Sequence, residues 1–70
     1  MTFKELAEQS LKEFPNGILV HFNSDDPADS NERYLDRNYM TDFFHVLDKE
    51  VEGYYFDDES NYELLEVFLK

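Results

Sequence analysis

The sequence contains no cysteine, and it has only two glycines and two prolines in 70 residues. Without cysteine, neither a disulfide nor a thiolate metal site can stabilise the chain. Gly17 and Gly53 alone cannot form the glycine-rich loop that binds phosphate groups in nucleotide enzymes. No apolar run approaches the ~20 residues that cross a bilayer, and residues 1–10 lack the apolar core of a signal peptide. We therefore expect a soluble, cytoplasmic protein.

Cations are also scarce, since six Lys and Arg stand against 17 Asp and Glu, a formal net charge of −11. Such an excess disfavours binding to nucleic acid or anionic lipid and is typical of disordered chains. The seven Phe and five Tyr instead favour a folded chain, because disordered segments are poor in aromatic residues. We expect one acidic domain over residues 1–70, with a thin stability margin that makes a homodimer a reasonable expectation.

The first third of the chain carries the clearest local signals. Residues 2–14 predict a helix, because Thr2 and Glu5 form a T-x-x-E capping box and apolar residues recur at helical spacing. The Pro-Asn-Gly turn at 15–17 ends that helix. Residues 18–22 follow as an apolar, β-branched strand, which we expect at the centre of a sheet.

The middle of the chain is more ambiguous. Residues 23–32 are polar and predict a loop, and residues 33–40 fit either a second strand or a helical turn. Residues 41–52 predict a second helix that begins at Thr41 and ends at Gly53. The alternative is a hairpin around Glu52 and Gly53, in which FFHVLD and YYFDD are strands.

Residues 54–56 predict a short strand and residues 57–60 a turn. A capping box formed by Ser60 and Glu63 then predicts a final helix to residue 69, with a strand over 62–69 as the alternative. The fold class we expect is α+β: a small single domain with a short antiparallel sheet and two or three helices, in the order α-β-(β)-α-β-α.

Residue types that carry catalysis are few. His21 and His45 are the only side chains with an ordinary pKa near neutrality, and no motif joins either to a nucleophile or an acid. A calcium loop starting at Asp57 would need Gly and Glu where Tyr62 and Phe68 stand. We therefore expect neither an enzyme, nor a cofactor, nor a metal site.

The acidic residues gather where cations are missing, and no cation lies between Lys49 and Lys70. Carboxylates three or four residues apart on a helix lie roughly 4.5–6 Å apart along its axis, and alternate strand residues rise about 6.6 Å. These spacings are of the same order as the phosphate repeat of DNA, about 3.4 Å of axis on each strand. The final helix would align Glu59, Glu63 and Glu66. The acids expected to bind a partner are Asp57, Asp58, Glu59, Glu63, Glu66, Asp48, Glu52, Asp25, Asp26 and Asp29.

Charge alone gives little affinity, because a surface ion pair contributes about 0–1 kcal/mol. A tight complex also needs buried anchors, which are commonly aromatic. We expect Tyr54 and Tyr55 to supply them, with Tyr34, Tyr39 and Tyr62 as further candidates.

These features favour a small acidic inhibitor that imitates nucleic-acid phosphates and blocks the DNA- or RNA-binding surface of a basic protein. In size and charge the chain is similar to phage-encoded DNA mimics, anti-CRISPR proteins and nuclease immunity proteins, although no motif carries that likeness. The alternative is a non-inhibitory interaction module or small subunit that docks through Tyr and Phe. An acidic surface that serves only solubility is a third interpretation.

Overall fold

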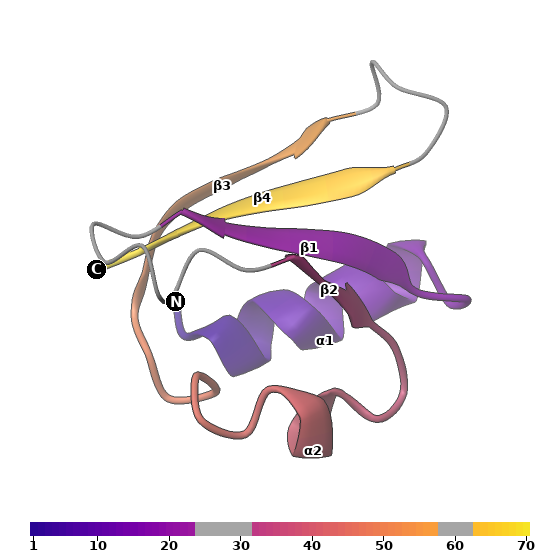
Figure 1. Cartoon of the computed structure of the whole chain (residues 1–70), viewed down its shortest axis with the longest axis horizontal. Helices are drawn as coiled ribbons and strands as arrows, with labels where there is room; N and C mark the ends of the chain where they lie inside the picture. The colour runs from indigo at the N-terminus through magenta and orange to yellow at the C-terminus, as the bar shows by residue number, and fades with distance from the viewer. Residues whose placement is uncertain (24–31, 58–62) are drawn as a thin grey trace.

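The computed structural model describes residues 1–23, 32–57 and 63–70, and shows two helices and four strands in a small mixed domain (Figure 1). Most of the loop expected at 23–32, and most of the turn expected at 57–60, lies outside the described residues. The elements are α1 (Phe3–Glu13), β1 (Ile18–Asn23), β2 (Glu32–Leu35), α2 (Tyr39–Asp42), β3 (Val51–Asp57) and β4 (Leu64–Leu69).

The first helix and strand form as the local signals predict. The Glu5 backbone N–H donates to Thr2 Oγ1 over 3.4 Å, and the Thr2 N–H donates to the Glu5 carboxylate over 3.0 Å. These two bonds satisfy backbone groups that the first helical turn leaves unpaired. The hydrogen bond from the Thr2 backbone, and then that from its hydroxyl, lowers the pKa of Glu5. Gly17 ends the following turn with φ +103°, a conformation that favours glycine.

The four strands form one sheet in the order β2-β1-β4-β3. As expected, β1 is central: it pairs antiparallel with β2 and parallel with β4. The expectation of an antiparallel sheet is wrong at the β1–β4 pair, which is parallel. Strand β3 runs antiparallel to β4, and β4 runs in the same direction as β1, beside which it lies.

The helix predicted over residues 41–52 is wrong, because α2 covers only Tyr39–Asp42 and turns follow it. The carbonyl groups of Leu47 and Lys49 accept hydrogen bonds from the backbone N–H groups of Lys4 and Phe3 at the start of α1. These turns therefore satisfy the unpaired donors of α1, and tertiary hydrogen bonding replaces a continuous helix. Residues 33–40 contain both elements that the sequence left open, since β2 occupies their start and α2 begins before their end.

The final helix is also wrong, and its alternative, a strand, is confirmed as β4. Leu65 and Val67 are buried while their neighbours are less so, which is the two-residue period of a strand. The strand predicted at 54–56 is confirmed within β3, and it pairs with β4 rather than with residues of the hairpin alternative.

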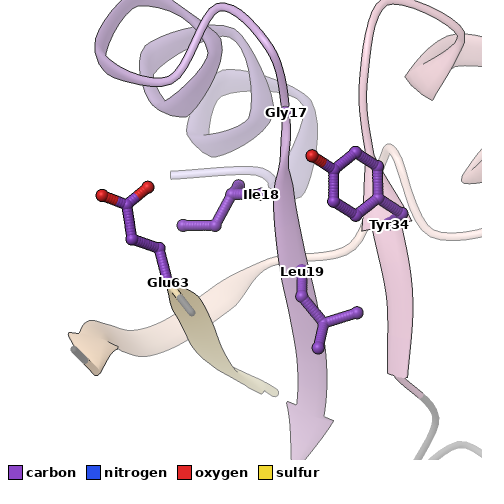
Figure 2. Close-up of a pocket in the computed structure, with 5 residues that line it drawn as sticks. All are labelled: Gly17, Ile18, Leu19, Tyr34 and Glu63. Atoms are coloured by element: carbon purple, nitrogen blue, oxygen red, sulfur yellow. The ribbon is translucent and has the colours of Figure 1, made fainter. Parts of the chain in front are cut away.

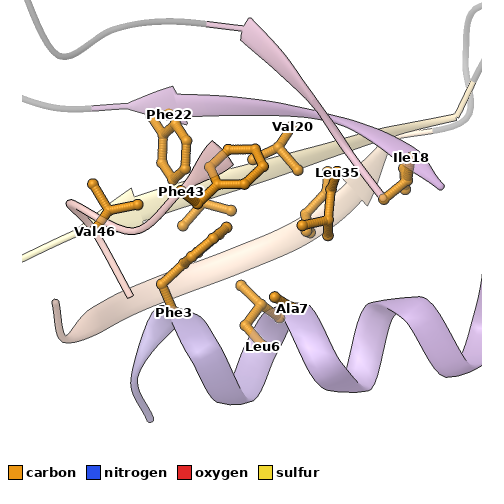
Figure 3. Packing of buried hydrophobic residues seen from close by; sticks show 11 residues of the cluster. Phe3, Leu6, Ala7, Ile18, Val20, Phe22, Leu35, Phe43 and Val46 are labelled. Carbon is orange, nitrogen blue, oxygen red and sulfur yellow. The ribbon is translucent and has the colours of Figure 1, made fainter. Parts of the chain in front are cut away.

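Both helices lie on the same side of the sheet, and the core fills the space between them and the strands (Figures 1 and 3). Three phenylalanine rings meet at its centre: Phe3 lies 5.1 Å from Phe22 and 5.3 Å from Phe43 between ring centroids. No described element covers the opposite side of the sheet. The buried apolar cluster comprises Phe3, Leu6, Ala7, Ile18, Val20, Phe22, Leu35, Phe43, Val46, Leu65 and Val67.

The two glycines offer a matched test of the turn before β1. A Cβ on Gly17 would lie 2.5 Å from the Tyr34 ring and 2.6 Å from the Leu35 carbonyl oxygen, whereas nothing lies within 4 Å of one on Gly53. Gly17→Ala should lower the free energy of unfolding by about 1–3 kcal/mol, measured by urea denaturation, and Gly53→Ala should change it little. Equal effects of the two substitutions would contradict this description of the turn.

Candidate functional site

The side of the sheet that faces away from the helices is not covered by any described element. Ile18, Val20 and Phe22 point into the core, so the alternate residues of β1 point the other way. The strand registers place residues of the three other strands beside them. We call this surface the open face; it consists of Glu32 and Tyr34 of β2, Leu19, His21 and Asn23 of β1, Leu64, Glu66 and Phe68 of β4, and Gly53, Tyr55 and Asp57 of β3.

Aromatic side chains are exposed on both flanks of the open face. Tyr34 is 54% exposed on β2, Tyr55 is 50% exposed on β3, and Phe68 is 39% exposed on β4. The Tyr55 and Phe68 rings lie 6.1 Å apart between centroids. Half-buried Leu19 and Leu64 lie between these flanks and are cross-strand neighbours. Exposed apolar groups that are contiguous in this way mark surfaces for binding other molecules.

A carboxylate occupies the centre of this face. Oε2 of Glu66 lies 2.8 Å from Nδ1 of His21, and the side-chain amide of Asn23 donates to the same oxygen. An ionised carboxylate only accepts hydrogen bonds, so the His21 ring donates through its Nδ1–H. The Glu66 side chain is 13% exposed and that of His21 30%. Two side chains of β1, those of His21 and Asn23, therefore hold the Glu66 carboxylate in position.

The open face carries no Lys or Arg. All six of these cations belong to the described residues, and none lies within 4 Å of the carboxylate of Glu32 or Glu66. Arg33 belongs to β2, but it alternates to the helix side and donates to the Asp42 carbonyl oxygen over 3.1 Å. The acids of the open face, Glu32, Asp57 and Glu66, thus share a surface on which the only group that can become positive is His21.

The acids expected in helical rows are distributed differently. Glu63 precedes β4, so it forms no helical row with Glu66; both were expected on a helix that is a strand. Glu52 is the extra residue at an irregularity of the β3 edge, and Asp48 lies in the turns after α2, so these two also form no row. Carboxylates on the helical part of the chain, such as Glu8 and Glu13, face solvent elsewhere. The remaining predicted acids, Asp25, Asp26, Asp29, Asp58 and Glu59, lie outside the described residues.

The two tyrosines expected to act together point to opposite sides of β3. Tyr55 belongs to the open face, whereas Gln9 of α1 donates to the Tyr54 hydroxyl over 3.5 Å on the helix side. Tyr39 packs against the core and donates to Glu8 over 3.4 Å. Burial, and then the Glu8 charge, raises the pKa of Tyr39. Its packing against the core places it on the helix side of the sheet rather than on the open face.

Sequence reasoning missed the contact between His21 and Glu66. The two residues are 45 positions apart and become neighbours only through the parallel β1–β4 register. Among the residues described, no group of three His, Asp or Glu side chains is placed to hold a metal ion. The same residues include no helix with the length and apolar character needed to cross a membrane.

Comparisons of the chain with models of known families, with curated proteins and with solved structures found no match.

The central pair can be tested by a double-mutant cycle. His21→Ala, Glu66→Ala and the double variant should show a coupling free energy of about 0.5–3 kcal/mol, as expected for residues in contact, measured by urea denaturation. The control cycle pairs Glu66→Ala with His45→Ala, since His45 is exposed and contacts Phe44 instead. Coupling no larger than in the control would show that the contact does not hold Glu66.

Proposed function

We propose that this protein is a small acidic inhibitor that uses its open face to occupy the DNA- or RNA-binding surface of a basic protein. The observation that carries this proposal is the composition of the face. It combines carboxylates and exposed aromatic rings, and none of the chain's Lys or Arg side chains lies on it. A cationic groove built for a nucleic-acid backbone is the complementary surface.

The carboxylates of the open face are spaced across the sheet rather than along a helix. Glu32 and Glu66 lie opposite the same residue, His21, on the two strands that flank β1, so their backbones are about 10 Å apart. Asp57 lies on β3, two residues beyond the partner of Glu66. These acids offer separate contact points for Lys and Arg side chains. The net charge of −11 attracts a basic partner at long range and speeds the encounter.

Aromatic residues supply the affinity that charge does not. Rings of Tyr and Phe that become buried on binding are common anchors of protein interfaces. Tyr55 and Phe68 already contact one another, so ordering them on binding sacrifices little side-chain entropy. Glu66 is likewise held by His21 and Asn23 before binding. A preorganised surface of this kind loses less free energy on association than a flexible acidic tail would.

A second candidate function is a non-inhibitory interaction module or small subunit, which the exposure of Tyr34, Tyr55 and Phe68 also favours. In that case the aromatic rings dominate binding and the partner's nucleic-acid site stays free. A second copy of this chain is a further candidate occupant, although the acids of two open faces would repel one another.

Two matched pairs of neutralised acids test the first proposal. The immobilised chain is used to capture a partner, whose affinity for each variant and for duplex DNA is then measured across a salt titration. Glu32→Gln with Asp57→Asn should weaken binding about tenfold at low salt, as two ion pairs of about 0.7 kcal/mol each would require. The control, Glu13→Gln with Asp42→Asn, removes the same charge from helical segments and should change affinity less than threefold.

Inhibition is a separate outcome of the same experiment. Stoichiometric amounts of this protein should release the partner from DNA. Affinity that is indifferent to salt and to both charge variants, but is abolished by Tyr55→Ala, would support the interaction module instead. A partner that still binds DNA normally within the complex would rule out inhibition.

A further inference from the structure

A pocket of about 330 Å³ lies at the end of the sheet where β1 begins (Figure 2). It is lined by Gly17, Ile18, Leu19, Tyr34 and Glu63. Its volume is at the lower end of the ~300–1,000 Å³ range of ligand pockets. A pocket of this size suits one side chain better than a cofactor.

The tyrosine wall of the pocket is fixed by the turn beside it. The Tyr34 hydroxyl donates to the Asn16 carbonyl oxygen over 3.1 Å. The ring lies so close to Gly17 that any side chain there would overlap it, with a Cβ only 2.5 Å from Cε1. Leu19 is the cross-strand neighbour of Tyr34 and adds an apolar surface beside the ring. Half of the ring nevertheless remains exposed.

The opposite wall carries the carboxylate of Glu63. Glu63 immediately precedes β4, whose first residue, Leu64, pairs with Leu19 of β1. Figure 2 shows Glu63 and Tyr34 on opposite sides of the first residues of β1. Glu63 is exposed, and no Lys or Arg of this chain lies within 4 Å of it. The pocket therefore combines an aromatic ring, an aliphatic side chain and a carboxylate without its own counter-ion.

We propose that this pocket binds an arginine side chain of the basic partner. The guanidinium pairs with the Glu63 carboxylate, while the methylene stem lies against Leu19 and the Tyr34 ring on the other side of the first residues of β1. This assignment deepens the proposed function, on which it rests for the source of the arginine. It gives the proposed interface a specific anchor at the edge of the open face, in addition to the general negative charge of the chain.

Arginine fits these walls better than the alternatives. A planar guanidinium can donate two parallel hydrogen bonds to a carboxylate, and the long methylene stem that carries it can pack against an aromatic ring and a leucine. It is also more weakly hydrated than the lysine ammonium, so removing it from water is easier. A purely apolar occupant would leave Glu63 without a cationic partner, and an anionic one would be repelled by it.

The pocket can be tested without the partner. N-acetyl-arginine methylamide is titrated into the ¹⁵N-labelled protein and backbone amide shifts are followed by NMR. Saturable shifts should concentrate at Gly17, Leu19, Tyr34 and Glu63, with a dissociation constant on the order of 1 mM. The citrulline analogue, a neutral compound of the same shape, should shift these amides at least fivefold less at equal concentration, and the lysine analogue should bind at least threefold more weakly.

Variants of Glu63 and Tyr34 then test whether each wall of the pocket contributes to arginine binding. Glu63→Gln and Tyr34→Leu should each weaken arginine binding at least threefold, while Glu52→Gln, which removes the same charge from the β3 edge, should leave it unchanged. A dispersed spectrum verifies that each variant is folded. Equal binding of citrulline or lysine, shifts spread evenly over all acidic residues, or wild-type affinity in Glu63→Gln would overturn the proposal.

The same variants separate this proposal from the proposed function. Glu32→Gln with Asp57→Asn keeps both walls of the pocket and should bind the arginine compound normally. Arginine binding without inhibition of a basic protein would leave the pocket standing and reject the inhibitor. Salt-dependent inhibition of a basic protein without arginine binding would support the inhibitor and reject the arginine pocket.

Discussion

The rest of the structure depends on one contact, the packing of three phenylalanine rings. Phe3 of α1 packs against Phe22 of β1 and against Phe43, which directly follows α2. This packing fixes a single layer of helix and turns on one side of a four-stranded sheet. A chain of 70 residues has little material for a second layer, and no described element forms one. A sheet covered on one side must expose the other, and that exposure creates the open face.

The alternation of side chains along each strand then decides which residues face the core and which lie on the open face. Along β1, β2 and β4, successive residues alternate between the core side and the open face, where the neighbours include Glu32, His21 and Glu66. Arg33 falls on the helix side by the same rule. The open face therefore carries carboxylates and aromatic rings but no Lys or Arg. At its centre, His21 and Asn23 hydrogen-bond to the Glu66 carboxylate and hold it in position. Negative charge is thus displayed beside exposed aromatic rings, which is the arrangement that the proposed inhibitor requires.

The sequence predicted those elements that depend on local signals. The capping box of Thr2 and Glu5, the turn at Gly17 and the apolar run of β1 are each decided by a few adjacent residues. The second and final helices were wrong because helical spacing of apolar residues also arises in turns and strands, and here tertiary hydrogen bonds decide. The site was predictable only in type: acids and tyrosines were expected to bind a partner, which stays a prediction. Their arrangement, including the contact of Glu66 with His21, depends on a parallel register between residues distant in sequence.

The central claim is that the open face, rather than the solvent side of α1, contacts the basic partner. Cross-saturation NMR on the complex with a captured partner tests it most directly, because irradiated partner protons reduce the signals of amides that they contact. The account predicts the largest losses at Leu19, Tyr34, Tyr55 and Phe68, with little change at Glu8 and Glu13. Losses concentrated along α1, with the open-face amides unaffected, would contradict it.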